Sequence, residues 1–326
     1  MKEQELTRLL HSRYGFMLML LVSVTGTVAA WFMGDVVHVG GDSGFGFPSA
    51  NEWISDSALS LGVSLGLNIV ISFLLLYLNR RFNIIRSVSM LFAGMFLVMQ
   101  AGQPSLMGQL YDGSVMCFFI LLAIIPFFST FQRPDRTRRI FLSFLLISLG
   151  SLTGYAYTVY LIVFFIGCFQ MQCFSLRGLL AALTGILTPY WILCGFGVVS
   201  LSSFRMPEFI NIFDALEGRD LAQIVVYTIV NLILGVGFGI FDIIKIYGYN
   251  GRARAYNGFW IILTIITTLF VIIDYTNLII YLPILNCCTA IQIGHFFTIN
   301  NTRRTYIPIC CIYVVYIILY LWSVTL

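Results

Sequence analysis

Charged residues are scarce in this sequence. Asp, Glu, Lys and Arg make up 10% of its 326 residues, whereas they supply about a quarter of a typical soluble domain. Hydrophobic residues make up 59% and the mean hydropathy is +0.93, so the composition predicts a membrane protein along the whole chain and excludes a soluble domain. The net charge of +4 comes from short basic clusters between apolar runs, which indicates membrane topology and not a nucleic-acid partner.

Motifs that carry known chemistry are also missing. The sequence has no pattern for nucleotide binding, haem attachment or zinc hydrolysis. Its eight cysteines lie in apolar runs without C-x-x-C spacing, so we expect buried thiols that pack as small hydrophobes, and we predict no cofactor. No column of charges passes through the apolar runs, which counts against an ion-coupled pump or secondary transporter.

The longest stretch without charge determines the predicted topology. Between Arg139 and Arg177 there is no Asp, Glu, Lys, Arg or His. As one helix this stretch would reach roughly 55 Å, but a bilayer core is about 30 Å thick. We therefore predict a hairpin of two short spans that turns at residues 150–157. Both ends of the hairpin are basic, so both are expected in the cytosol.

The same rule extends to the whole chain and predicts an all-α fold. We expect about eleven transmembrane helices in one domain over residues 1–326, with a cytoplasmic N-terminus and a periplasmic C-terminus. The spans are predicted at residues 14–33, 58–79, 87–101, 114–131, two within 140–176, 178–201, 221–244, 258–273, 275–294 and 307–326. This arrangement leaves only Arg205 and Arg219, of 18 basic residues, on the outer side. A signal peptide is the alternative for the first span, but its apolar core is longer than usual.

Several polar residues fall inside or beside the predicted spans. We expect the amides among them to form hydrogen bonds between helices; they are Asn68, Asn231, Asn286 and Gln292. Asp242 lies three residues before Lys245 near the inner boundary, where pairing and exposure explain it equally well. His295 is expected at the inner interface, and Asp274 in an outer turn.

Two outer loops, residues 34–57 and 202–220, hold the candidate site. In the first, Asp35, His38 and Asp42 follow one another at intervals of three and four residues. Carboxylates and an imidazole together can bind a divalent cation or act as a general base. The alternative is a flexible exported loop with five glycines that merely tolerates acids. We take Asp35 and Asp42 as candidate catalytic residues, with His38, Arg205 and Arg219 as candidate substrate-binding residues and no metal site.

The middle of the chain resembles a known group of proteins. The features are a basic loop, a short hairpin around Gly154, a single Arg177, the run Leu-Leu-Ala-Ala-Leu-Thr-Gly-Ile-Leu-Thr-Pro-Tyr-Trp at 179–191, and later Leu-Pro at 282–283 and His-Phe-Phe at 295–297. Over roughly residues 60–320 this order resembles an uncharacterised family of multi-pass inner-membrane proteins from Bacteroidota. The resemblance implies a bacterial cytoplasmic membrane and brings no catalytic residues.

A second resemblance concerns the hairpin. A basic loop, a short helix ending at Leu149 and Gly150, a turn with Thr153 and a returning helix are similar to the middle of GT-C glycosyltransferases. The resemblance implies an enzyme that uses a lipid-linked sugar, with Asp35 or Asp42 as catalytic base and outer basic residues on the lipid phosphate. The chain departs from the pattern in its lack of a clear acidic pair and of an extracytoplasmic domain after the last helix. These departures are consistent with an inactive or only fold-related member.

Three functional hypotheses follow. The first is a non-catalytic component of cell-envelope biogenesis in the bacterial inner membrane, in contact with membrane lipids and a membrane protein partner. The second is a GT-C-like glycosyltransferase that acts on a lipid-linked glycan at the outer face. The third is a transporter.

Overall fold

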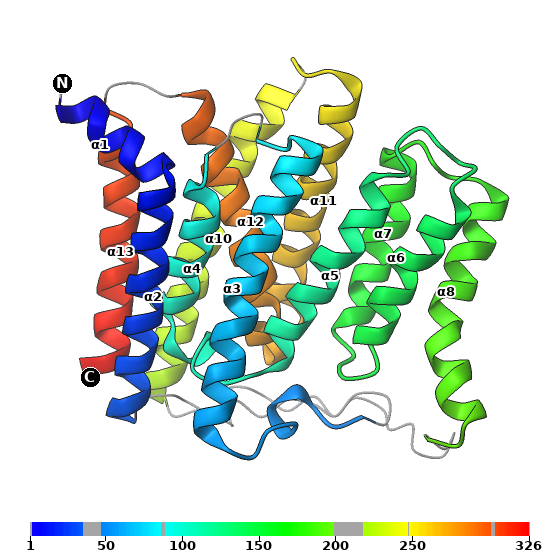
Figure 1. The fold of residues 1–326 in the computed structure, drawn as a ribbon, viewed down its shortest axis with the longest axis horizontal. Helices are drawn as coiled ribbons and strands as arrows, with labels where there is room; N and C mark the ends of the chain where they lie inside the picture. The colour runs from blue at the N-terminus through cyan, green and yellow to red at the C-terminus, as the bar shows by residue number, and fades with distance from the viewer. Residues whose placement is uncertain are drawn as a thin grey trace.

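The structure, a computed structural model, describes residues 2–34, 47–85, 89–198, 218–246, 248–300 and 304–325. These residues form α-helices and short 3-10 helices and contain no strand, so the all-α prediction is confirmed for them (Figure 1). The elements are α1 (Lys2–His11), α2 (Arg13–Met33), η1 (Ala50–Glu52), α3 (Ser57–Phe82), α4 (Leu91–Gly102), η2 (Pro104–Leu106), α5 (Asp112–Phe128), α6 (Thr137–Gly150), α7 (Tyr157–Gln170), α8 (Leu176–Gly195), α10 (Gly218–Ile246), α11 (Gly251–Ile273), η4 (Tyr275–Asn277), α12 (Leu278–Ile299) and α13 (Tyr306–Thr325).

Every predicted span overlaps one of these helices over most of its length; residues 87–88 and 199–201 of two spans lie outside the described residues. Seven of them, α2, α3, α8, α10, α11, α12 and α13, are long and apolar enough to cross a membrane. The other four, α4 to α7, have 12 to 17 residues and reach only about 18–26 Å. The chain is therefore a multi-pass membrane protein, and the crossing of all eleven helices stays a prediction. The short helix α1 was not predicted.

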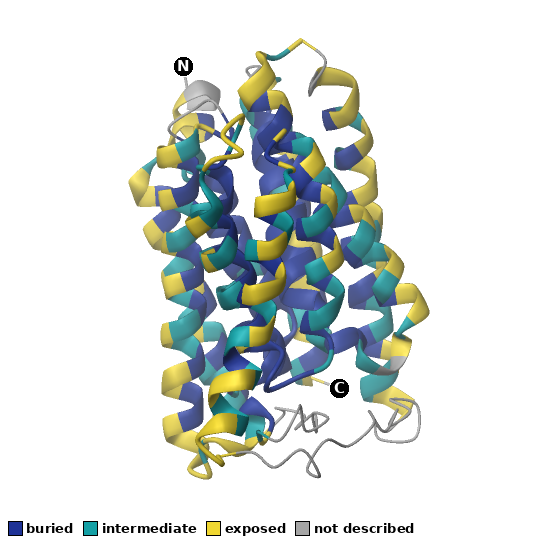
Figure 2. Cartoon of the chain, turned by 90° about the vertical axis from the view of Figure 1, so that its right-hand side faces the viewer, coloured by how far each residue is buried: buried dark blue, intermediate teal, exposed yellow. Residues whose placement is uncertain are grey.

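The helices stand side by side around α12. The chain begins at the upper end of the bundle and finishes at the lower end (Figure 1). Within α12, 94% of the most apolar window is buried, because α4, α5, α10 and α11 surround it. The outer helices bury one face and expose the other (Figure 2), as expected for helices between a protein core and lipid.

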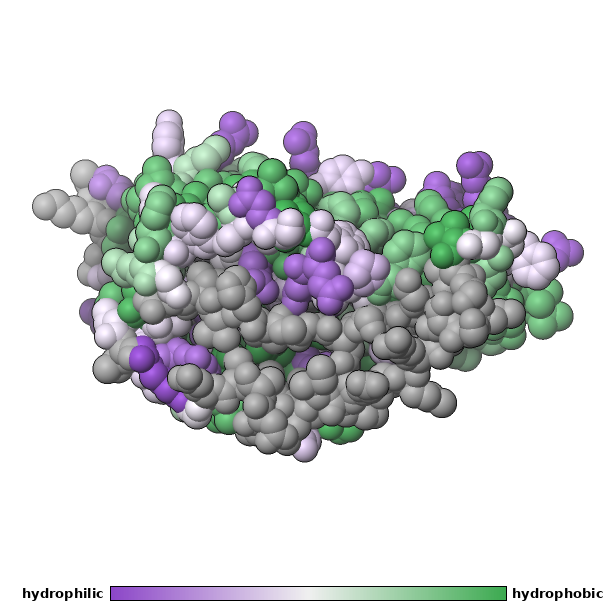
Figure 3. Space-filling model, turned by 90° about the horizontal axis from the view of Figure 1, so that it is seen from below, coloured by the Kyte–Doolittle hydropathy of each residue, from purple (hydrophilic) through white to green (hydrophobic). Residues whose placement is uncertain are grey.

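Helices α6, α7 and α8 form a group at one side of the bundle, on the right in Figure 1. Trp191 on α8 and Phe196 directly after this helix, at the edge of the group, are about four-fifths exposed. Seen from the lower end, apolar side chains are visible at both ends of the elongated outline (Figure 3). Such large exposed apolar faces are suited to contact with lipid.

The predicted hairpin turn is confirmed between α6 and α7. The ring of Tyr157 fills the space that a Cβ on Gly150 would occupy, so this position requires glycine. The backbone N–H of Thr153 donates to the carbonyl of Gly150 (3.0 Å) and closes the turn. The neighbouring α8 also packs tightly on α6, because a Cβ on Gly185 would lie 2.6 Å from the carbonyl oxygen of Phe141.

Polar side chains in the core join helices, as predicted for the four amides within the spans, of which Gln292 on α12 donates to Thr264 on α11 (2.8 Å). Gln100 on α4 donates to Asn68 on α3 (2.8 Å) and accepts from Asn286 on α12 (2.7 Å). Asn286 also donates to the Tyr227 hydroxyl on α10 (2.8 Å), and Asn231 accepts from Tyr316 on α13 (2.7 Å). All of these side chains are buried.

Candidate functional site

The upper end of the bundle carries a basic cavity, which we call the arginine pocket. It lies where α3 and α5 end and α11 begins, and its volume is about 450 Å³. The residues that line it are Arg81, Phe82, Asn83, Phe128, Ser129, Phe131, Arg133, Arg136, Asn250, Arg252, Ala253 and Tyr256. They come from three segments far apart in the sequence, so the pocket exists only in the folded chain.

The end of α3 supplies the first arginine. Asn83 adopts the left-handed conformation (φ 53°) that stops the helix, and its N–H donates to the carbonyl of Asn79 (2.7 Å). The side chain of Asn79 accepts from the N–H of Ile85 (2.8 Å) and holds the chain after the turn. The guanidinium of Arg81 lies 5.6 Å from the centre of the Phe82 ring, a distance typical of cation–π contact.

The loop between α5 and α6 supplies two more arginines of the pocket, Arg133 and Arg136. Arg136 donates to the carbonyl oxygen of Ser129 (2.7 Å), and so does Arg139 in the first turn of α6 (3.3 Å). The N–H of Gln132, a residue with φ 53°, donates to the carbonyl of Met171 and fastens the loop to the end of α7. These bonds hold Arg133 and Arg136 on the wall of the pocket.

The start of α11 supplies the fourth arginine and one of the four aromatic rings, Tyr256. The side chain of Asn250 accepts from the N–H of Ala253 (3.0 Å) and caps the helix. Arg252 lies 6.0 Å from the centre of the Phe131 ring. Tyr256 stacks on Phe128 with ring centres 4.5 Å apart, and its hydroxyl donates to the Phe128 carbonyl (3.0 Å).

The charged side chains that line the pocket are all positive. Its described lining has four arginines and no Asp or Glu. Burial, followed by the like charges of Arg133 and Arg139, lowers the pKa of Arg136, while Asp135 in the same loop opposes this shift. An anion bound in the pocket would reduce the repulsion between these arginines. A guanidinium group can donate two parallel hydrogen bonds to two oxygens of one phosphate or carboxylate.

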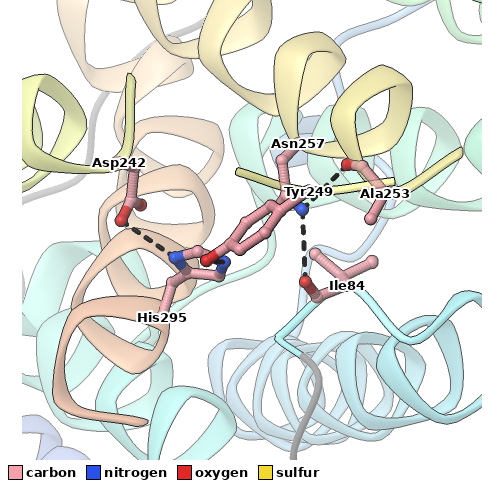
Figure 4. Close-up of polar contacts among 6 residues, drawn as sticks. All are labelled: Ile84, Asp242, Tyr249, Ala253, Asn257 and His295. Carbon is pink, nitrogen blue, oxygen red and sulfur yellow. Dashed lines mark hydrogen bonds and ion pairs between the residues drawn. The ribbon is translucent and has the colours of Figure 1, made fainter. Parts of the chain in front are cut away.

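A second polar cluster lies close by, between α10, α12 and the start of α11 (Figure 4). Oδ1 of Asp242 lies 3.0 Å from Nδ1 of His295, and both side chains are more than nine-tenths buried. The Tyr249 hydroxyl lies 3.3 Å from the other ring nitrogen of His295. The partner of Asp242 is thus His295 and not Lys245, whose ammonium lies over the Phe241 ring at 5.6 Å. His295 lies near the end of α12, and its side chain is buried there (2% exposed); its position at the inner interface stays a prediction.

The start of α11 connects this cluster to the arginine pocket. Asn257 donates to the carbonyls of Ala253 (3.0 Å) and of Ile84 (3.3 Å) beyond the end of α3 (Figure 4). In the segment from Tyr249 to Asn257, Tyr249 contacts His295, whereas four other residues line the arginine pocket: Asn250, Arg252, Ala253 and Tyr256. The pocket can bind an anion, whereas the buried imidazole already has a partner at each nitrogen.

The residues predicted as the outer site are mostly outside the part of the chain that the structure describes. This holds for Asp35, His38, Asp42 and Arg205. Arg219 is described, and it is exposed in the first turn of α10, at the lower end of the bundle (Figure 1). The prediction that these residues converge is therefore untested.

Cysteines were expected to be buried, and five of them are. Cys117 and Cys287 lie with their sulfur atoms 3.3 Å apart inside the core. Cys194 and Cys310 are half-buried, and Cys311 is exposed on α13. Within the described ranges, no three His, Cys, Asp or Glu residues gather as a metal site would require.

The sequence interpretation missed the arginine pocket because it used basic residues only to assign topology. A signal was present, since three clusters predicted at the same end, residues 80–81, 133–139 and 252–254, each lie within three residues of Phe or Tyr. Comparison with known proteins finds no matching family model, no matching curated protein and no matching solved structure.

Proposed function

We propose that this chain is a non-catalytic component of cell-envelope biogenesis in a bacterial cytoplasmic membrane. In this proposal eleven helices cross the membrane, the N-terminus is cytoplasmic and the C-terminus is periplasmic, so the arginine pocket faces the cytosol. Membership of the uncharacterised Bacteroidota family belongs to the same proposal and is supported by the sequence pattern alone.

The proposed activity is binding of the phosphate-bearing headgroup of an anionic lipid in the arginine pocket. The observation that carries this proposal is the set of four arginines around about 450 Å³ with no carboxylate in the described lining. The hydroxyls of Ser129 and Tyr256 in the wall donate to backbone carbonyls. This arrangement favours binding over chemical turnover.

A lipid is favoured over a soluble anion by the position of the pocket. It lies at the level where α3 and α5 end, and Phe82, Phe128 and Tyr256 form its aromatic side. Aromatic rings collect at the boundary between membrane and water. Basic pockets between helices at the cytoplasmic side suit anionic headgroups.

Lipid binding to the purified, delipidated protein tests the proposal. Native mass spectrometry would compare phosphatidylglycerol and cardiolipin with phosphatidylcholine, and Arg252→Gln with the parent. Loss of one charge-assisted hydrogen bond is expected to weaken anionic-lipid binding by about tenfold or more. Phosphatidylcholine, which carries no net charge, is expected to bind weakly to both proteins.

Arg177→Gln is the matched control. Arg177 is exposed in the first turn of α8, as Arg252 is in the first turn of α11, but it does not line the pocket. The control is expected to bind anionic lipid like the parent protein. Equal loss in both variants, or preferential binding of inorganic phosphate in competition with lipid, would contradict the lipid proposal.

The GT-C-like glycosyltransferase is a second proposal, favoured by the short α6–α7 hairpin with Thr153 in its turn. In this proposal Asp35 or Asp42 is the catalytic base at the outer face. Transfer of sugar from a lipid-linked donor in membranes would be abolished by Asp35→Asn or Asp42→Asn. Transfer that survives both substitutions, or that never occurs in the parent, rejects this alternative.

A further inference from the structure

The arginines of the arginine pocket are held in different ways. The guanidinium of Arg136 donates to the carbonyl of Ser129 (2.7 Å), and that of Arg81 donates to a tyrosine hydroxyl of its own helix. The guanidinium of Arg252 has no hydrogen bond among the residues that the structure describes, and its contact is with the ring of Phe131, whose centre lies 6.0 Å away. The place of Arg252 therefore depends on the backbone at the start of α11, which carries it.

Side-chain contacts on both sides of Arg252 attach the start of α11 to the bundle. Asn257 donates to the carbonyl of Ile84 beyond the end of α3 (3.3 Å). On the other side, the Tyr249 hydroxyl lies 3.3 Å from Nε2 of His295 on α12. Figure 4 shows the Tyr249 side chain extending from the start of α11 to the His295 ring.

Short backbone contacts join Tyr249 firmly to the first turn of α11. The carbonyl of Asn250 accepts from the N–H of Arg254 (2.9 Å), and its side chain accepts from the N–H of Ala253 (3.0 Å). The carbonyl of Tyr249 itself accepts from the guanidinium of Arg254 (3.3 Å). A displacement of Tyr249 is therefore passed to the turn that carries Arg252.

Asp242 determines how the His295 ring meets Tyr249. Its Oδ1 lies 3.0 Å from Nδ1 of His295, and both side chains are more than nine-tenths buried. A carboxylate only accepts hydrogen bonds, so Nδ1 carries the hydrogen of the neutral ring and Nε2 is left as an acceptor. The Tyr249 hydroxyl then donates to Nε2.

Stability alone does not explain this buried pair. An ionisable pair usually adds little stability over apolar side chains of the same volume, because both groups lose their hydration. Buried ionic groups can instead select one arrangement of the chain. The arrangement that Asp242 and His295 select here is the position of Tyr249, and with it the start of α11.

We propose that Asp242, His295 and Tyr249 are positioning residues of the arginine pocket, which hold the first turn of α11 so that Arg252 contacts the bound anion. None of these three residues lines the pocket itself, so they act only through Arg252. This inference rests on the proposed binding of an anionic headgroup in the pocket.

Tyr249→Phe tests the positioning role. It removes the hydroxyl and keeps the ring, whose centre lies 5.6 Å from that of His295. The affinity of the delipidated full-length protein for phosphatidylglycerol, titrated by native mass spectrometry, is expected to fall about three- to tenfold, and no further than in Arg252→Gln. The control Tyr14→Phe removes an exposed hydroxyl in the first turn of α2, outside the pocket lining, and is expected to bind like the parent.

Double variants separate positioning from a general loss of structure. In Arg252→Gln the side chain that Tyr249 positions is absent, so adding Tyr249→Phe is expected to weaken binding no further. In Arg136→Gln, which alters an arginine held through Ser129, Tyr249→Phe is expected to weaken binding by the same factor as in the parent. An equal further loss in both backgrounds would assign the effect to general loss of structure and overturn the proposal.

The same titrations distinguish this inference from the proposed lipid binding. If Arg252→Gln binds phosphatidylglycerol like the parent, the lipid proposal fails, and the positioning role fails with it. If Arg252→Gln binds weakly and Tyr249→Phe binds like the parent, the lipid proposal stands and only the positioning role is overturned.

Discussion

Single polar side chains decide which helices meet in the core of this protein. Asn286 on α12 donates to both Gln100 on α4 and Tyr227 on α10, and so joins three helices through one amide. In lipid each such bond contributes on average about 0.6 kcal/mol, because helices in the unfolded state also find polar partners. The main effect of these hydrogen bonds is therefore to determine which helices are neighbours, and their contribution to the free energy of unfolding is small.

Substitution of Asn286 tests this network. Asn286→Leu removes two interhelical hydrogen bonds and is expected to destabilise the protein by about 1 kcal/mol, measured as a lower apparent melting temperature in detergent. Thr184→Val is the control, since the Thr184 hydroxyl is exposed and bonds only within its own helix. An equal decrease in the two variants would contradict a specific role for the network.

The Asp242–His295 pair is more costly to break than an ordinary hydrogen bond. Asp242→Leu leaves the His295 ring nitrogen buried without its partner, which is expected to cost about 1–3 kcal/mol. The double variant Asp242→Leu/His295→Leu removes both polar groups and is expected to recover part of that loss. Melting of the parent, Asp242→Leu, His295→Leu and the double variant in detergent measures the coupling. If the double variant is destabilised by the sum of the two single losses, the pair has no coupling.

At the scale of elements, the helix α1 is the one that the sequence interpretation missed. It is amphipathic and lies against α2 and α13 at the upper end (Figure 1). Its last residue, His11, contacts the Ser89 hydroxyl through Nδ1 (2.7 Å), and its carbonyl accepts from the N–H of Met90 (3.3 Å). Burial lowers the pKa of His11 below its ordinary value.

This shift predicts that the packing of α1 depends on pH. A histidine whose pKa is lowered by folding stabilises the folded state above its ordinary pKa of about 6.5 and loses that contribution as the pH falls below it. Hydrogen exchange in α1 is therefore expected to be faster at pH 5.5 than at pH 7.5, after correction for intrinsic rates. His11→Gln is expected to remove the difference. If the exchange rate of α1 still depends on pH in His11→Gln, another titratable group causes the effect.

At the scale of the whole molecule, the described basic residues gather at the upper end, apart from Arg219 at the lower end. The proposed orientation places the upper end in the cytosol. Ser55 lies in the segment before α3 at the lower end, and Asp135 lies in the loop between α5 and α6 at the upper end; both are exposed.

Thiol labelling in intact cells tests this orientation. A membrane-impermeant reagent is expected to modify Ser55→Cys in intact cells and Asp135→Cys only after permeabilisation. The parent protein controls for its native cysteines, of which Cys311 is exposed. If instead Asp135→Cys is labelled in intact cells and Ser55→Cys only after permeabilisation, the protein has the opposite topology and the arginine pocket lies outside.

Composition and the pattern of apolar and basic residues are enough to predict the class of protein and the positions of its apolar helices, but not α1. Hydropathy and charge are local properties, so an apolar run of sufficient length predicts a helix whatever surrounds it. The hairpin was predictable for the same reason, because a run too long for one span must turn, and glycine marks the turn at Gly150.

Which polar groups come together depends on how the helices pack in the folded chain. Arg81, Arg133 and Arg252 are separated by 50 residues or more in the chain, and nothing local specifies that they surround one cavity. Likewise, the partner of Asp242 is 53 positions away on another helix, not three residues along its own. Distances between helices follow from side-chain packing, here from glycines that admit close contact, and packing is a property of pairs of surfaces that a single segment does not contain.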